Sequence, residues 1–443
     1  LSRGLGDVYK RQDYAYFQKA ICYGFVSKNE KKIEELNAFL KLYPKSEYRD
    51  DALFELGNTY VAENKKDLAI DTYDRLNTEF KKGSYTSRAI LRQGLIYYNS
   101  DKDEQALTKF KKVAADFPKT PEALEAVATA RLIYVDNGKV DEYAAWVRTL
   151  DFVAVTDAEL DNDTYEGAEK QYLQNNTKQA IAGFSGYVSK FPNGIHALKA
   201  NFYLAQSYFS DAQESKSIPN YEFVVTQPRS EFTEQSLSRL AQIFLKDNNC
   251  DKAIPLLSRL ENEADFPQNK TYAQSNLMRC YYDKKDYDNS VVYAEKVLEN
   301  PKTDSTVKSD AQIIVARAAM QSGDEAKARA TYAKLQTIAK GELAAEALYY
   351  DAYFKNKEEK FEASNTVIQK LAKNYSSYKY FGAKGLILMA KNFYGLKDSF
   401  QATYILDSVI KNFTDFPDVV SEAQRELDNI KNEESKTNSS IGG

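Results

Sequence analysis

The sequence repeats itself every 37 residues, and this period is the strongest constraint on what the chain can fold into. Small residues recur at that interval (57 − 20 = 37 and 94 − 57 = 37), and tyrosine stands three positions after five of the first six. A second, mostly small, residue follows twelve positions after most of the first ones, and an apolar residue four positions later. Residues three or four apart share one face of a helix, so each repeat is expected to hold two amphipathic helices. The first series is Ala20, Gly57, Gly94, Arg131, Ala168, Ala205, Ala241, Met278, Ala316, Asp351 and Ala390; its tyrosines are Tyr23, Tyr60, Tyr97, Tyr134 and Tyr208; the second series is Ala69, Ala106, Ala180, Ser217, Ala253, Ser290, Ala328, Ala363 and Ala402.

Proline marks the corners between repeats. In the stretch from Asp103 to Pro121, the apolar residues Ala106, Phe110 and Val113 lie on one helical face. Pro118 ends that helix, and Pro121 suits the first turn of the next one. The stretch therefore predicts a helix, a tight corner and a second helix. Glycine in a helix costs about 1 kcal/mol relative to alanine, so Gly57 and Gly94 are expected to admit a close approach of the second helix.

This pattern resembles the tetratricopeptide repeat, whose usual period is ~34 residues. The longer period and the corners Tyr43-Pro44, Phe117-Pro118 and Phe191-Pro192 are similar to repeats of bacterial envelope proteins, namely outer-membrane assembly lipoproteins and Tol-Pal-associated coordinators. The resemblance implies an all-α solenoid of about eleven helix-turn-helix repeats. It also implies a non-enzymatic scaffold that binds a protein or peptide partner, located in the periplasm at the outer membrane; a cytoplasmic location is the alternative.

The domain organisation follows from where the repeats run. Residues 1–12 lack the period and are interpreted as a cloning or assembly scar. Whether the parent protein carries a signal peptide, a lipid anchor or further repeats upstream is therefore left open. Residues 13–416 form the solenoid, 417–432 a capping helix, and 433–443 a disordered tail. Loose junctions are expected near Asp151 and Pro228, and the second helix of the sixth repeat is uncertain because Pro219 and Pro228 bracket a short segment.

Composition argues against several classes of partner. The net charge of −4 gives no electrostatic reason to expect nucleic acid. No apolar run approaches the ~20 residues that span a bilayer, so no transmembrane segment is expected in this chain.

No motif points to catalysis, a cofactor or a metal. His196 is the only histidine and follows a corner, which favours a surface role at a helix start. Cys22, Cys250 and Cys280 have no metal-ligand spacing and are expected to be buried or half-buried packing thiols, although Cys250 and Cys280 lie in adjacent repeats where a disulfide is conceivable. The acidic run from Asp157 to Asp163 lacks the glycine of a calcium loop and reads as an acidic helix start.

A partner-binding groove is the remaining candidate site. Leu91, Leu95 and Tyr98 share one face of a first helix at spacings i, i+4 and i+7, and matching positions recur in three neighbouring repeats. In tetratricopeptide arrays this face lines the concave surface, where partners bind; packing against the neighbouring first helix is the alternative. The candidate groove residues are Phe54, Asn58, Val61, Leu91, Leu95, Tyr98, Leu132, Val135, Tyr165, Glu169 and Tyr172.

The leading interpretation is thus a scaffold that holds a polypeptide. An accessory segment of a larger enzyme or secretion machine, with its catalytic part outside this chain, is the alternative, and a spacer without a groove ligand is a third. The sequence names neither the partner nor the pathway.

Overall fold

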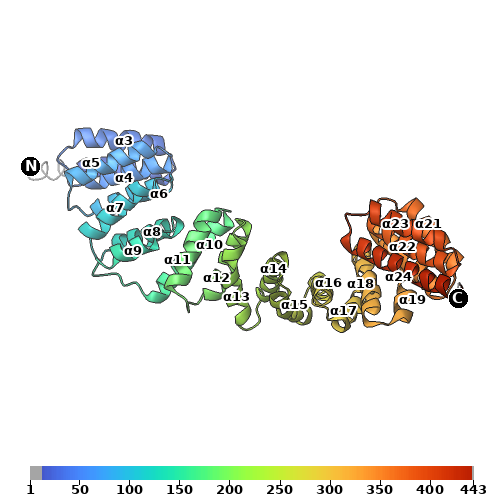
Figure 1. The fold of residues 1–443 in the computed structure, drawn as a ribbon. Coiled ribbons are helices and arrows are strands. Elements are labelled where there is room, and N and C mark those ends of the chain that lie inside the picture. Colours follow the sequence, from blue (N-terminus) through green and yellow to red (C-terminus); the bar gives the residue numbers. More distant parts are fainter. Residues whose placement is uncertain (1–11, 442–443) are drawn as a thin grey trace, which may run out of the picture. The chain divides into compact units, whose positions relative to one another are not determined.

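A computed structural model describes the backbone of residues 12–441 and the side chains of residues 12–435. This part of the chain contains 23 helices, α2 to α24, and no strand. Figure 1 shows it as coiled ribbons joined by short connections. The predicted all-α helical-repeat solenoid is confirmed: α2 to α23 form eleven consecutive pairs, and α24 follows them. The interpretation of the first residues as a cloning or assembly scar concerns residues 1–11, which lie outside the part of the chain that the structure describes.

The chain divides into two compact halves, Leu1–Val224 and Val225–Gly443. The first half holds α2 (Gln12–Phe25), α3 (Asn29–Leu42), α4 (Arg49–Ala62), α5 (Lys66–Glu79), α6 (Thr86–Tyr98), α7 (Asp103–Asp116), α8 (Pro121–Asp136), α9 (Val140–Val147), α10 (Asp157–Leu173), α11 (Thr177–Lys190), α12 (Ala197–Ser210) and nearly all of α13 (Glu214–Thr226). The second half holds α14 (Thr233–Lys246), α15 (Cys250–Glu263), α16 (Pro267–Asp283), α17 (Tyr287–Glu299), α18 (Ser305–Ser322), α19 (Glu325–Leu335), α20 (Gly341–Lys357), α21 (Phe361–Asn374), α22 (Lys379–Gly395), α23 (Ser399–Asn412) and α24 (Pro417–Ile441).

Each turn inside a helix pair contains one residue in the left-handed conformation. Such residues recur at nearly constant intervals, and only two of the eleven are glycine. Each of these turns is closed by a backbone hydrogen bond to a carbonyl near the end of the first helix. The acceptor is a tyrosine in six of the eleven turns, as from Lys65 N to Tyr60 O and from Lys102 N to Tyr97 O. Closing the end of a helix in this way satisfies carbonyls that would otherwise lack a partner. The left-handed residues are Ser27, Asn64, Asp101, Gly138, Asn175, Ala212, Asn248, Lys285, Gly323, Glu359 and Lys397.

The predicted small positions let the two helices of a pair touch. A Cβ atom at Gly57 would lie 2.4 Å from Cε1 of Tyr73, so the ring of the second helix rests on the backbone of the first. Ala69 and Ala106 have no exposed surface, and neither do the aromatic residues four positions later, Tyr73 and Phe110. In these repeats the small residues and the rings therefore form a core between the two helices of a pair, in the register that the 37-residue period predicts.

The register in the tenth repeat differs from the prediction by one residue. Ala352 and Ser364 occupy the two small positions with no exposed surface, whereas Asp351 is half-buried and Ala363 is exposed. The Ser364 hydroxyl donates to the carbonyl of Ala352 at 2.8 Å, as Ser290 donates to Met278 at 3.0 Å two repeats earlier. The shift arises because corner lengths vary between repeats.

Two further segments differ in extent from what the sequence indicates. The second helix of the sixth repeat is formed as α13, with Pro219 inside it. Helix α24 continues past residue 432 to Ile441. A polar helix end without packing partners frays readily, and the disorder of 433–443 in solution stays a prediction.

Candidate partner-binding surface

The structure separates the eleven candidate groove residues into three groups by exposure. Phe54, Leu91, Val135 and Tyr165 are buried, with at most 9% of their surface exposed. Val61 and Leu132 are exposed, at 38% and 52%. The remaining five, Asn58, Leu95, Tyr98, Glu169 and Tyr172, are half-buried. The predicted strip is therefore not continuously exposed, and its role in binding stays a prediction.

The buried members pack within and between repeats. The ring of Phe54 stacks on Tyr85 with centroids 4.7 Å apart, and Tyr85 precedes the first helix of the next repeat. Tyr165 stacks on His196 at 4.2 Å, again across a repeat boundary. These rings are covered across a repeat boundary, because spacings of three and four residues also describe the contact between successive repeats; their role in binding stays a prediction.

The exposed and half-buried members remain accessible. Val61 lies in the last turn of α4, and Leu132 lies in α8. Leu95 and Tyr98 lie in α6 of the repeat between them, against the core that includes Leu91. The half-buried polar members are held in place by tyrosines: Asn58 accepts a hydrogen bond from Tyr73 at 2.8 Å, and Glu169 accepts one from Tyr165 at 2.6 Å. Their remaining acceptor capacity is available to a partner.

A groove lies beside Asn58, over α2 and α4. It has a volume of about 450 Å³, and Ile21 and Phe25 of α2 and Ala62 of α4 contribute its apolar part. Lys32 pairs with Glu55 across it at 2.6 Å. Phe25 is 83% exposed, the highest value among the large apolar side chains described. Phe25 is not among the residues predicted from the sequence, although the apolar pair Phe25-Val26 at the end of a first helix was a usable signal.

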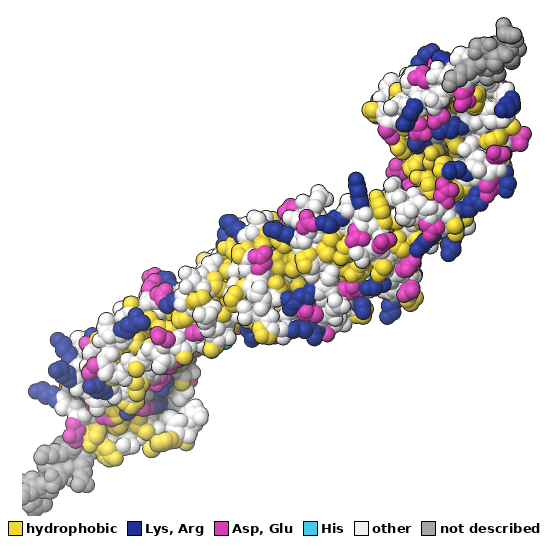
Figure 2. All heavy atoms as spheres, turned by 60° about the horizontal axis from the view of Figure 1, so that its bottom comes forward, with side chains coloured by type: hydrophobic (Ala, Val, Ile, Leu, Met, Phe, Trp, Pro, Cys, Tyr) yellow, Lys and Arg dark blue, Asp and Glu magenta, His cyan; other side chains and the backbone are white. Residues whose placement is uncertain are grey.

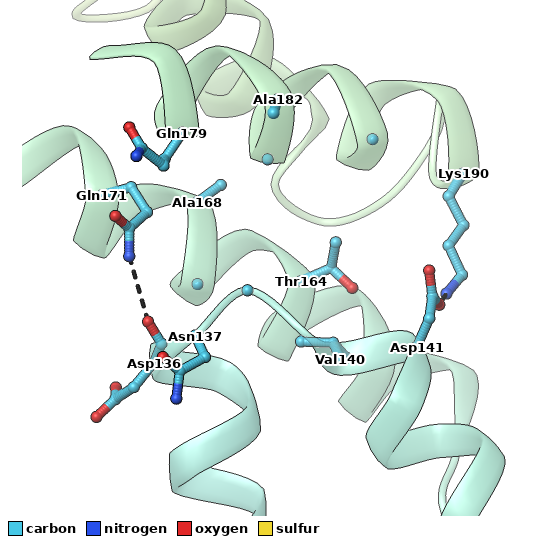
Figure 3. A pocket seen from close by; sticks show the side chains of 14 residues that line it. Asp136, Asn137, Val140, Asp141, Thr164, Ala168, Gln171, Gln179, Ala182 and Lys190 are labelled. Atoms are coloured by element: carbon cyan, nitrogen blue, oxygen red, sulfur yellow. Dashed lines mark hydrogen bonds and ion pairs between the residues drawn. The ribbon is translucent and has the colours of Figure 1, made fainter. Parts of the chain in front are cut away.

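A second cavity, of about 500 Å³, lies against α10 and α11 (Figure 3). Its wall on α11 is made of small side chains, because Ala182, Gly183 and Gly186 face it. At one end Gln171 donates to the carbonyl of Asp136 at 3.2 Å, and at the other Lys190 pairs with Asp141. These ion-paired and amide groups offer recognition contacts but no nucleophile beside a base.

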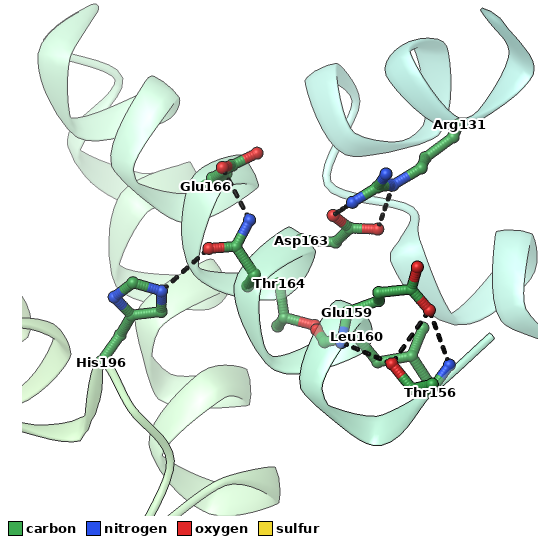
Figure 4. A network of polar contacts seen from close by, with 9 residues as sticks. Arg131, Thr156, Glu159, Leu160, Asp163, Thr164, Glu166 and His196 are labelled. Atoms are coloured by element: carbon green, nitrogen blue, oxygen red, sulfur yellow. Dashed lines mark hydrogen bonds and ion pairs between the residues drawn. The ribbon is translucent and has the colours of Figure 1, made fainter. Parts of the chain in front are cut away.

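A polar network joins the fourth and fifth repeats (Figure 4). Arg131 binds both carboxylate oxygens of Asp163, at 2.8 and 2.5 Å, and Asp163 is 1% exposed. The hydrogen bonds to Asp163 raise the pKa of Arg131, which keeps the guanidinium charged. Arginine thus stands at a small-residue position in the sequence pattern because it neutralises a buried carboxylate of the next repeat.

The acidic run is a helix start, as predicted. Helix α10 begins at Asp157, and Thr156 caps it by accepting a hydrogen bond from Glu159 N at 3.2 Å, while Glu159 accepts one from Thr156 N at 2.8 Å. His196 is half-buried rather than on the surface, since it also contacts Asn162 at 3.0 Å through Nε2.

The cysteines differ from the packing thiols that were expected. Cys250 and Cys280 form a disulfide, with Cα atoms 5.4 Å apart, between the start of α15 and helix α16 of the next repeat. Cys22 is exposed. The sequence places Cys250 and Cys280 in adjacent repeats, but their distance depends on the turn at Asn248, which periodicity does not specify.

Figure 2 shows acidic, basic and hydrophobic side chains interspersed over the face it presents. In residues 12–441 no helix is long and apolar enough to cross a membrane. Among the side chains that the structure describes, no group of three His, Cys, Asp or Glu residues is arranged to hold a metal ion.

Comparison with known proteins identifies the repeat. Residues 51–82 and 88–120 match the family model of the tetratricopeptide repeat. A tetratricopeptide repeat protein from Parabacteroides merdae aligns at 14% identity over 58% of this chain and 96% of its own, with a TM-score of 0.29. Yeast Tom70 aligns at 13% identity over 96% of both chains, with a TM-score of 0.31. The comparison with curated proteins finds no match. The matched residues are two consecutive helix pairs of the all-α array, so these two repeats are similar to tetratricopeptide repeats.

Proposed function

We propose that this chain is a non-enzymatic scaffold that binds a polypeptide along the first helices of repeats two to five. Tetratricopeptide repeats generally mediate protein–protein interactions, and this fold typically carries no catalysis. The observation that supports a site here is the exposure of two apolar side chains, since Leu132 is 52% exposed and Val61 is 38% exposed. They lie on the first helices on either side of the helix that carries the half-buried Leu95 and Tyr98. An apolar partner side chain would gain burial at these positions, while Asn58 and Glu169 would bond to its backbone.

The experiment selects peptides from a displayed random library on the full chain and measures their affinity by calorimetry. Leu132→Ala is expected to weaken a selected peptide by about 1–2 kcal/mol, or roughly fivefold to thirtyfold in Kd. Leu124→Ala is the matched control, because Leu124 lies in the same helix and is 51% exposed. Equal effects of the two variants, or no effect of Leu132→Ala on any selected peptide, would refute this site.

Tyr98→Ala tests the half-buried part of the surface. If Tyr98 contacts the partner, the variant loses peptide affinity by about 1–2 kcal/mol while its thermal unfolding stays close to that of the parent protein. A large fall in the melting temperature that accompanies the loss of affinity would instead assign Tyr98 to the core, where it touches the cluster around Leu91.

We further propose that the protein works in a bacterial periplasm, at the outer membrane, in envelope assembly or maintenance. The support is the Cys250–Cys280 disulfide, because disulfides persist in oxidising compartments and are rare in the cytosol. Fractionation of cells that express the full gene, with alkylation of free thiols at lysis, tests this location. Recovery in the cytosol with Cys250 and Cys280 alkylated would overturn the periplasmic proposal and leave the scaffold proposal intact.

A further inference from the structure

The Cys250–Cys280 disulfide lies beside a surface cavity in the second half of the chain. The cavity has a volume of about 630 Å³, and both cysteines line it. Its other walls come from the turn between α14 and α15 and from the last two turns of α16. A small molecule that enters this cavity therefore meets the bridge.

The two cysteines differ in accessibility, and their positions in the repeats explain why. Cys280 is 1% exposed, and its counterparts in the neighbouring repeats, Ile243 and Ala318, are 4% and 1% exposed. Cys250 begins α15 and is half-buried, as is Tyr287 at the start of α17. A nucleophile from solvent therefore reaches the bridge at Cys250.

Electrostatics alone would favour attack at the other sulfur. In thiol–disulfide exchange a thiolate attacks one sulfur and expels the other, and the more stable thiolate leaves faster. The start of α15 stabilises a thiolate at Cys250, by roughly twofold to fivefold for a helix dipole. A residue that is 1% exposed, however, leaves almost no room for an attacking thiolate. Access is thus the larger effect, and attack falls on Cys250.

The charges around the cavity indicate which class of thiol enters it. The two cations of the lining, Arg279 and Lys284, are each paired with a carboxylate. Two exposed carboxylates of the lining, Asp247 and Asp283, have no ion-pair partner among the described side chains. The uncompensated charge is therefore negative, which attracts a cationic thiol and repels an anionic one.

We propose that Cys250–Cys280 is an exchangeable bridge, and that a small aminothiol, which carries an ammonium group, modifies it at Cys250. The thiol loses its proton to solvent, and its thiolate attacks Sγ of Cys250. The bond between the two cysteines breaks, and Sγ of Cys280 leaves as a thiolate that takes a proton from solvent. The product is a mixed disulfide on Cys250 whose substituent lies in the cavity.

A second aminothiol completes the reduction. Its thiolate attacks the outer sulfur of the mixed disulfide and releases the thiolate of Cys250, which the start of α15 stabilises. Two thiols have then become one small disulfide, and the protein bridge has gained two electrons and two protons. The site lies in the second half, apart from the surface around Leu132, and does not rest on the proposed function.

The position of the modification is the first test. The full chain with Cys22→Ser retains only the two bridge cysteines and is treated with cysteamine. Acid and then N-ethylmaleimide stop the reaction early, and trypsin places Cys250 in residues 247–252 and Cys280 in residues 280–284. Mass spectrometry is expected to find cysteamine on the first peptide and maleimide on the second.

The class of thiol is the second test. Exchange rates are measured for cysteamine and for 3-mercaptopropionate, which is anionic, and each is divided by the rate of the same thiol with uncharged hydroxyethyl disulfide. This normalised rate is expected to be at least about threefold higher for cysteamine at low ionic strength. Asp283→Asn should reduce the preference. Asp415→Asn, at an exposed position outside the cavity, is the matched control and should keep it.

Four results would overturn the proposal. They are cysteamine mainly on Cys280, equal normalised rates for the two thiols, an unchanged preference in Asp283→Asn, and a rate that does not rise with thiol concentration. The last result would mean that the bridge opens only after the second half unfolds. Far-ultraviolet circular dichroism at the thiol concentrations used establishes that the protein remains folded during the measurement.

Discussion

A Cβ atom at Gly94 of α6 would lie 2.5 Å from Cε1 of Phe110 in α7. Real Cβ atoms do not approach a ring this closely, and Phe110 has no exposed surface into which it could move. Gly94→Ala is therefore expected to lower the free energy of unfolding by about 1–3 kcal/mol through overpacking, despite the better helix propensity of alanine. Denaturant titration followed by circular dichroism measures the loss.

Gly186 of α11 supplies the control for Gly94. It also lies within a helix, but a Cβ there would meet no atom within 4 Å. Gly186→Ala should stabilise the protein by up to about 1 kcal/mol, because only the propensity term remains. If both substitutions shift stability in the same direction, contact with Phe110 is not the reason for glycine at position 94.

The fold could be predicted because most repeats contain the same contact between a small residue of the first helix and an apolar residue of the second. Gly57, Gly94 and the aromatic residues opposite them reveal the register several times, so an exception such as Arg131 does not hide it. Where corner lengths vary, spacing alone misplaces the register, as at Asp351 and Ala363. Residue type does not decide the second position, because Ala363 and Ser364 are both small, but at the first position Ala352 is small and Asp351 is not.

The candidate site was less predictable, since apolar spacing does not say which neighbour covers a face. Phe54 and Tyr165 are first members of their spaced triplets and Leu132 is the middle member of its own, and the spacing alone does not show that Tyr85 and His196 of the following repeats cover the first two. Those covering residues stand in the corners, outside the periodic helices. Their positions depend on corner geometry, which a single sequence specifies poorly.

Arg131→Ala is expected to destabilise the first half strongly. The substitution leaves the Asp163 carboxylate, 1% exposed, without its cation. Removing one partner of a fully buried pair costs about 3–5 kcal/mol; because 37% of the Arg131 side chain is exposed, we expect about 2–4 kcal/mol. Chemical denaturation followed by circular dichroism provides the measurement.

The control for Arg131 is Asp116→Asn, which breaks the exposed pair of Lys112 and Asp116 within α7. Exposed pairs contribute at most about 1 kcal/mol, so this variant should unfold nearly as the parent protein does. The double variant Arg131→Leu, Asp163→Leu should recover part of the stability lost in Arg131→Ala, since no buried charge remains. A double variant as unstable as the single one would show that the loss reflects packing of the arginine stem.

The cap of α10 should make stability depend on pH. Hydrogen bonds from the backbone and side chain of Thr156 lower the pKa of Glu159 below its ordinary 4.5. Since the folded pKa is lower than the unfolded one, this contribution is fully present above the unfolded value and is lost as pH falls through the folded value. Thr156→Ala should cost about 1 kcal/mol at neutral pH, and less under acid conditions. Urea titrations of both proteins across the acid range test this; a difference that grows with acidification would contradict the cap.

Reduction of Cys250–Cys280 is expected to destabilise the second half of the chain. The bridge joins residues 30 positions apart, and the loop contains the remainder of α15 and most of α16. In the chain-entropy description, a loop of this size gives about 3–4 kcal/mol by restricting the unfolded state. Thermal unfolding with and without a thiol reductant should show the difference, and Cys250→Ser with Cys280→Ser should unfold like the reduced parent and ignore the reductant. Cys22→Ser should keep the full response to reductant, because Cys22 belongs to the other half and is unpaired. A parent protein whose unfolding is the same with and without reductant, and matches the double serine variant, would show that the bridge contributes nothing to stability.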